Sequence, residues 1–161
     1  MLKYCLIVCL MAAFLAGCGS EQTVETIADE WMAPVMASQR SVSVELPEDA
    51  VAPVLESDGQ QIYFSEDYEI YLENRSAGDL QQTIRYLSGF DKDALTVMKT
   101  SQGIFDRYEF VWTCAGEEGQ RLGRAVILDD GNYHYCMSAL WDAEKATAVS
   151  WEEVFDSFTL Q

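Results

Sequence analysis

Residues 104–140 read IFDRYEFVWTCAGEEGQRLGRAVILDDGNYHYCMSAL, and this stretch carries the clearest structural pattern in the domain. Turn signals at Gly116–Gly119 and Asp130-Gly131 divide it into three strand-like segments, which are Ile104–Ala115, Gln120–Asp129 and Asn132–Leu140. Alternation along the first segment places four side chains on one face: Tyr108, Phe110, Trp112 and Cys114. The stretch therefore predicts a three-stranded antiparallel meander.

Other parts of the chain also have the alternation or the composition of strands. These segments are Ser41–Leu46, Gln61–Phe64, Tyr68–Glu73 and Ala94–Thr100. Pro47 follows the first of them, and Asp58-Gly59 is a strong turn signal ahead of the second. We expect these strands to extend the sheet of the meander.

Two segments have helical periodicity. In the first, Asp79 is a suitable N-cap, Gly89 suits the C-terminal end, and the apolar residues between them are Leu80, Ile84 and Leu87. Near the C-terminus, Ser150-x-x-Glu153 has the pattern of a capping box, ahead of the apolar stripe Trp151, Val154, Phe155 and Phe158. The fold class predicted from all these segments is α+β: a single domain with an antiparallel sheet and a few helices.

The N-terminus has the build of an export signal. Lys3 supplies a positive charge, and Tyr4–Phe14 is an uncharged and mostly apolar segment that is too short for an ordinary membrane-spanning helix. Leu15-Ala16-Gly17-Cys18 follows and closely resembles the lipobox of bacterial lipoproteins. The resemblance implies cleavage before Cys18 and attachment of a diacylglyceryl group to its thiol. Two acyl chains on one residue give durable membrane anchoring. An ordinary signal peptide with a chance cysteine is the alternative.

These patterns predict three parts: a signal peptide at 1–17, a lipidated cysteine and acidic tether at 18–40, and a domain at 41–161. Within the tether, four apolar residues fall at helical spacing, interrupted by Pro34: Val24, Ile27, Trp31 and Val35. Such a short helix would dock on a partner, pack on its own domain or fray.

The domain also resembles the PsbP-like fold, an α/β/α sandwich found in extrinsic proteins of photosystem II. The residues that carry this likeness are the segment Val42-Ser43-Val44-Glu45-Leu46-Pro47-Glu48, the meander through Ile104–Leu140, and the closing Phe155-Asp156-Ser157-Phe158. It would cover roughly Ser41–Leu160. The chain is also similar to small uncharacterised lipoproteins of Gram-positive bacteria. A fold of this kind hosts unrelated roles, so it implies no functional residue beyond Cys18.

The charge of the chain restricts its partners. There are 27 acidic and 10 basic side chains, and loss of Lys3 with the signal would change the net charge from −17 to −18. Such a chain cannot hold phosphate backbones by counterion release, so nucleic acid is excluded as a partner class. An anionic lipid surface would repel it, so the lipid on Cys18 must provide the membrane attachment. The negative charge is compatible with positively charged partners, such as divalent cations and basic protein segments. The alternative is that the charge only keeps the protein soluble.

Export would leave two cysteines besides Cys18, because Cys5 and Cys9 lie in the signal. In the predicted meander Cys114 faces about Arg121 and Cys136 faces about Ala125, which separates the cysteines by roughly 15 Å. A disulfide needs Cα atoms within about 7 Å, and a shared metal site is equally disfavoured. Because strand register is easily misjudged from sequence, a bridge between the two cysteines is left open.

His134 is the only histidine, so any catalytic triad must use it. It lies in mid-strand, with Cys136 two residues away on the same face. The pair would make either a thiol site or an ordinary part of the sheet, and no third orienting group is visible. Asp129-Asp130-Gly131-Asn132 lacks the spacing of a calcium-binding loop and has the composition of a hairpin turn.

Aromatic residues on the predicted strands form either a core or a stacking platform for sugars, and strand composition favours the core. They are Tyr63, Tyr68, Tyr71, Tyr108, Trp112, Tyr133, Tyr135 and Trp141. The sequence predicts neither a catalytic residue nor a cofactor or metal. We therefore expect a non-enzymatic lipoprotein, anchored on the extracytoplasmic side of the cell membrane, that binds an envelope protein. A lipoprotein that binds a small molecule, metal or glycan is the alternative.

Overall fold

The computed structural model describes residues 37–50, 53–57, 59–116, 119–143 and 149–161. The predicted signal peptide, the lipobox with Cys18 and most of the predicted tether lie outside these residues. Ala37–Gln161 forms one compact unit. Among the described residues, no helix combines the length and apolar character that crossing a membrane would require.

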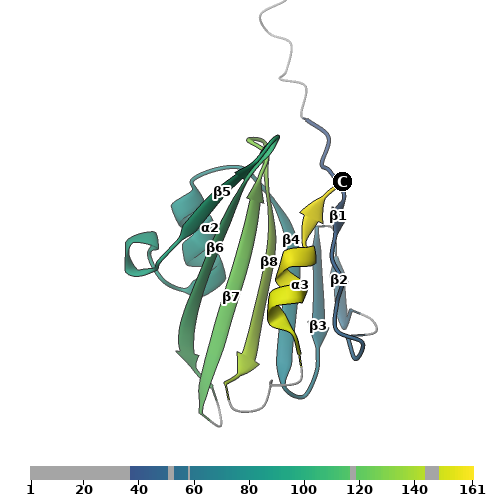
Figure 1. The fold of residues 1–161 in the computed structure, drawn as a ribbon, viewed down its shortest axis with the longest axis vertical. Coiled ribbons are helices and arrows are strands. Elements are labelled where there is room, and N and C mark those ends of the chain that lie inside the picture. The colour runs from purple at the N-terminus through teal and green to yellow at the C-terminus, as the bar shows by residue number, and fades with distance from the viewer. Residues whose placement is uncertain (1–36, 51–52, 58, 117–118, 144–148) are drawn as a thin grey trace, which may run out of the picture. The chain divides into compact units, whose positions relative to one another are not determined.

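One antiparallel sheet of seven strands forms the body of the domain, in the order β2-β3-β4-β8-β7-β6-β5 (Figure 1). Its strands are β2 (Leu55–Ser57), β3 (Gln60–Phe64), β4 (Tyr68–Ser76), β5 (Met98–Gln102), β6 (Phe105–Ala115), β7 (Gln120–Asp129) and β8 (Tyr133–Asp142). A separate two-stranded pair joins β1 (Val42–Ser43) to β9 (Thr159–Leu160), near the C-terminus of the chain.

The predicted meander is confirmed as β6, β7 and β8, but the second hairpin is shifted. Cys114 pairs with Arg121 as expected, whereas Cys136 pairs with Ile127 rather than with Ala125. The turn is centred on Gly131 and Asn132 instead of Asp130 and Gly131, and Gly131 adopts a φ of +87°. Asp side chains fix this turn, because Asp129 Oδ1 accepts from the Gly131 amide and Asp130 Oδ1 accepts from the next two amides.

Each face of the sheet carries one helix, so the domain has three layers (Figure 1). Helix α3 (Trp151–Ser157) packs over one face, where the buried strand residues include Tyr68, Ile70, Val126, Leu128, Tyr135 and Met137. Helix α2 (Leu80–Ser88) packs over the other face, against Phe110, Trp112, Ala125, Ile127 and Cys136. The coarser part of the prediction, a single domain built on an antiparallel sheet with a few helices, is confirmed.

The ends of the two helices differ in how well the sequence predicted them. For α2, Asp79 accepts a hydrogen bond from the Gln81 amide and Gly89 closes the helix at a φ of 80°, both as expected. For α3, the predicted capping box is wrong, because the Ser150 side chain makes no capping hydrogen bond. The buried positions of the α3 stripe are nevertheless those expected: Trp151, Val154, Phe155 and Phe158.

Several short elements differ from the prediction. The first strand comprises only Val42–Ser43 instead of Ser41–Leu46, and β5 begins at Met98 rather than Ala94. Lys92–Ala94 forms a single 3₁₀ turn, η2, ahead of β5. The sequence did not predict β2 or β9, because two or three residues are too few for a period-2 pattern to stand out.

Candidate functional site

His134 lies on the face of β8 that α2 covers, and its side chain is 1% exposed. Its Nδ1 is 2.8 Å from the Thr83 hydroxyl oxygen of α2, and its Nε2 is 3.7 Å from an Asp129 carboxylate oxygen. Burial lowers the pKa of His134, and this outweighs the opposite effect of Asp129. The imidazole is therefore a neutral group that joins α2 to the sheet, and solvent does not reach it.

Cys136 lies on the same face and is 1% exposed. Burial raises the pKa of its thiol, so the reactive thiolate is disfavoured. Both Cys114 and Cys136 are free thiols, and the β7 residues opposite them are Arg121 and Ile127. The predicted neighbours His134 and Cys136 thus share a face, but they form neither an accessible nucleophile nor a bridge to Cys114.

A polar cluster that the sequence did not reveal lies beside them. Glu73 is 9% exposed, and burial raises the pKa of its carboxyl. The guanidinium of Arg75 lies 3.7 Å from the centre of the Tyr86 ring, and Tyr86 belongs to α2. This cluster depends on how α2 packs against β4, and no local sequence signal encodes that contact.

The aromatic residues on the strands mainly form the core, as their composition predicted. Tyr68, Trp112, Tyr133 and Tyr135 are all buried. The Trp141 ring stacks on Trp151 with 4.5 Å between centroids. The core interpretation is therefore confirmed for these residues, and they do not form an exposed stacking platform.

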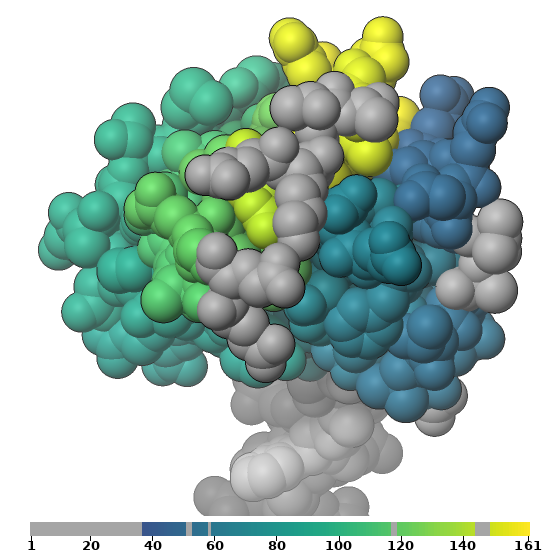
Figure 2. Space-filling model, turned by 90° about the horizontal axis from the view of Figure 1, so that it is seen from below, coloured from purple at the N-terminus to yellow at the C-terminus, as the bar shows by residue number. Residues whose placement is uncertain are grey.

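A hollow that described residues line lies where three distant segments meet. We call it the acidic groove, and its volume is about 690 Å³. Its lining residues are Glu45, Leu46, Pro47, Glu48, Asp49, Asp67, Tyr68, Val149, Ser150, Glu153 and Val154. In Figure 2 the three segments appear dark blue, blue-green and yellow on one side of the domain. The pairing of β1 with β9 and the packing of α3 bring them together.

The acidic groove combines an apolar floor with a rim of carboxylates. Tyr68 and Val154 are buried beneath it, while Glu45, Glu48, Asp49 and Glu153 are exposed. Asp49 is held in place, because it accepts hydrogen bonds from Tyr68 Oη at 2.6 Å and from Ser65 Oγ at 2.9 Å. The bond from Tyr68 lowers the pKa of Asp49, so this carboxyl stays ionised at neutral pH.

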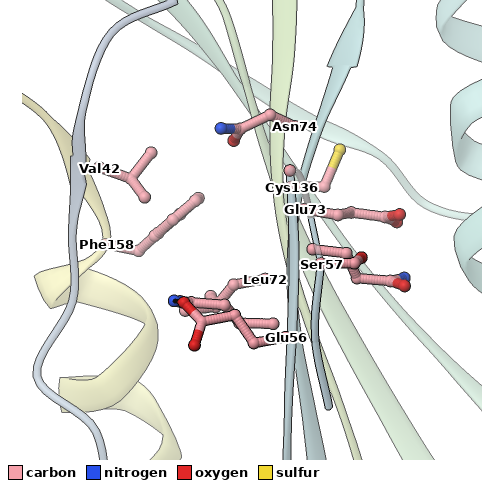
Figure 3. A pocket seen from close by; sticks show the side chains of 11 residues that line it. Val42, Glu56, Ser57, Leu72, Glu73, Asn74, Cys136 and Phe158 are labelled. Atoms are coloured by element: carbon pink, nitrogen blue, oxygen red, sulfur yellow. Dashed lines mark hydrogen bonds between the residues drawn. The ribbon is translucent and has the colours of Figure 1, made fainter. Parts of the chain in front are cut away.

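A second, smaller cavity of about 310 Å³ lies by the β2–β3 hairpin, β1 and the C-terminal end of α3 (Figure 3). Val42, Leu72 and Phe158 give it apolar walls. Its polar lining includes Glu56, Ser57, Gln61, Glu73 and Asn74. Gln61 Nε2 donates to Glu56 Oε1 at 3.1 Å, which orients part of this lining. The cavity has the mixed character of a small-ligand site.

Metal binding has no support among the residues that the structure describes, which contain no group of three His, Cys, Asp or Glu side chains placed to hold an ion. The Asp129–Asn132 segment is a hairpin turn, as its composition predicted. Its carboxylates accept backbone amides at 2.8 to 2.9 Å.

Comparison with known proteins gives a likeness of fold. No protein-family model matches the chain, and no curated protein matches it. A solved structure from Bacteroides thetaiotaomicron VPI-5482 is similar, with a TM-score of 0.50 and 14% sequence identity. The match covers 74% of this chain and 45% of that one, so this chain spans less than half of the length of the similar protein. At this identity the likeness concerns the fold alone.

Proposed function

We propose that this protein is a lipid-anchored lipoprotein on the extracytoplasmic side of the cell membrane, and that its domain binds a protein partner in the cell envelope without catalysing a reaction. The three-layer arrangement, with one helix on each face of an antiparallel sheet, supports the further proposal of a PsbP-like sandwich.

The observation that carries the binding role is the contrast between accessible and buried groups. The histidine and the nearby thiol that could support catalysis are both 1% exposed. The acidic groove, in contrast, presents charged and apolar groups together at the surface. Apolar contact with a charged rim is the usual composition of a protein-binding surface.

The anchor is supported by the order of features at the N-terminus. A positive charge, a short apolar segment and small residues precede Cys18. Because a chain of net charge −17 is repelled by anionic lipid headgroups, its side chains would not hold it at such a membrane, and the proposed attachment needs the lipid on Cys18.

A small-ligand lipoprotein is the second candidate, and the cavity of Figure 3 favours it. A glycan or another polar small molecule would find amide and carboxylate groups beside an apolar wall there. A ligand that binds this cavity would raise the melting temperature of the protein in proportion to its saturation.

Replacement of the anchor residue tests the proposed attachment. Cys18→Ala should abolish lipid attachment, so that the protein is found in the medium or as an uncleaved precursor. Fractionation of cells, followed by mass spectrometry of the N-terminus, measures both results. Cys9→Ala is the matched control, since Cys9 lies in the predicted apolar segment of the signal and should be dispensable. Cys18→Ala protein that is still processed and membrane-bound would contradict the anchor.

A further inference from the structure

The carboxylates of the acidic groove have no basic partner among the described residues. Six described arginine and lysine side chains form ion pairs, all with carboxylates outside the groove. These pairs are Arg40 with Asp130, Arg85 with Asp91, Lys99 with Asp106, Arg121 with Glu69, and Arg107 and Arg124 with Glu109. Arg75 lies over Tyr86, and Lys92 does not line the groove. The negative charge of the groove is thus uncompensated within the described part of the domain.

The acidic groove has apolar surface beside carboxylates, and a long basic side chain likewise has an aliphatic stem and a charged head. Lysine and arginine bury an aliphatic stem along apolar surface and keep the charged head near water. Leu46, Pro47 and Val154 provide apolar surface for the stem. Glu48 and Glu153, from segments more than a hundred residues apart, provide carboxylates for the head.

We propose that the acidic groove binds an extended segment of the partner protein that carries lysine or arginine side chains alternating with apolar ones. This inference rests on the proposed partner-binding function and specifies the chemistry of the partner. An anionic lipid or nucleic-acid phosphate is excluded by repulsion. A bare metal ion is disfavoured, because no three ligating side chains converge among the described residues.

A fluorescent peptide provides the direct test. The probe is a peptide of about seven residues with three lysines and two leucines, titrated into the full-length lipidated protein in neutral detergent micelles and followed by fluorescence anisotropy. We expect saturable binding whose Kd rises by about tenfold when salt increases from about 50 to about 300 mM, because rim charges are screened. The same peptide with glutamine in place of each lysine should not bind.

Two double variants separate the groove from the general negative field. Glu48→Gln/Glu153→Gln removes two carboxylates of the groove and should weaken binding by about tenfold. Asp93→Asn/Glu152→Gln removes two exposed carboxylates that do not line the groove, and should change Kd by less than about twofold. All four side chains are exposed, so both variants should keep the melting temperature of the unaltered protein.

Equal weakening by both double variants would overturn the inference, because it would show attraction to the net charge. Binding of the glutamine peptide, or no binding at millimolar peptide, would also overturn it. The inference would also be overturned if the protein bound calcium ions at micromolar concentration without the peptide, and if Glu48→Gln/Glu153→Gln abolished that binding. If a cellular partner is captured equally by the unaltered protein and the groove variant, the partner-binding function stands and only the groove assignment fails. Peptide binding without any cellular partner would contradict the function instead.

Discussion

His134 shows how a buried side chain can set the response of a protein to pH. Its pKa is lowered by burial from an ordinary value of 6.5, so the folded protein keeps it neutral. In the unfolded chain this histidine binds a proton below about pH 6.5, whereas in the folded protein it does not. The contribution of His134 to stability is therefore fully present above about pH 6.5 and is lost as the pH falls toward its pKa in the folded protein. Because His134 is the only histidine in the chain, its effect can be isolated.

We predict that the free energy of unfolding falls as the pH is lowered from about 7.5 to about 5.5, with a slope of at most about 1.4 kcal/mol per pH unit. His134→Asn should flatten this slope, as measured by urea unfolding at each pH. Arg75, Asp129 and Asp130 also act on the imidazole, and the buried Glu73 nearby has a raised pKa. Glu73 acts in the opposite direction. Because its pKa is raised in the folded protein, its contribution to stability is present at low pH and is lost as the pH rises through that pKa. An unchanged slope in His134→Asn would contradict the assignment of the pH dependence to His134. Glu73→Gln is the comparison variant, because it removes the opposing contribution of Glu73 and leaves the histidine in place.

At this scale the sequence predicted positions better than partners. Alternation placed His134 and Cys136 on one face correctly. It could not reveal that Thr83, 51 positions away, supplies the hydrogen bond to the imidazole. Such a contact depends on how α2 packs on the sheet, and local patterns carry no record of that packing.

A buried arginine adds polar contacts to the apolar packing that holds helix α3 on its sheet face. Arg107 is 5% exposed, and it donates from Nη1 to the Phe158 carbonyl at 2.9 Å and from Nη2 to the Phe155 carbonyl at 2.8 Å. Its Nε donates to Glu109, which also accepts from Arg124. Burial alone would raise the pKa of Glu109, but the two arginines outweigh it and lower that pKa. The carbonyls at the C-terminal end of α3 thus gain a cationic partner.

We predict that Arg107→Met lowers the free energy of unfolding by about 3 kcal/mol, because it removes the arginine donor of the Phe155 and Phe158 carbonyls and leaves Glu109 with Arg124 as its one remaining arginine partner. Arg85→Met is the matched control. Arg85 pairs with Asp91 at the surface, and its loss should cost less than about 1 kcal/mol. Urea unfolding of both variants measures the difference. Similar stability of the two variants would show that Arg107 does not hold α3.

Elements with strong local signals were predictable, and those defined by long-range pairing were not. Asp79 and Gly89 mark the ends of α2 in the sequence as they do in the structure. Ser150 looked equally suitable for α3 but makes no cap. The shift of the second hairpin arose because two adjacent aspartates both bind turn amides, a choice that the Asp130-Gly131 pattern alone did not distinguish.

For the whole molecule, the net charge of −17 indicates a binding surface only when the fold shows where carboxylates gather. The sequence suggested basic partners but gave no location. Residues 45–49 and 149–154 come together because β1 pairs with β9 and α3 packs on the sheet. Neither β9 nor the position of α3 could be read from sequence, so the acidic groove was not predictable from it.

Crosslinking in intact cells, with mass spectrometry of what stays attached to the lipidated protein, tests the proposed partner-binding role most directly. We predict one recurrent envelope protein that is captured by the unaltered chain and is reduced when Cys18→Ala removes the anchor, because the lipid holds the domain at the membrane where that partner lies. Absence of any recurrent protein at good crosslinking yield would contradict the proposed function, as would capture of cytoplasmic proteins only.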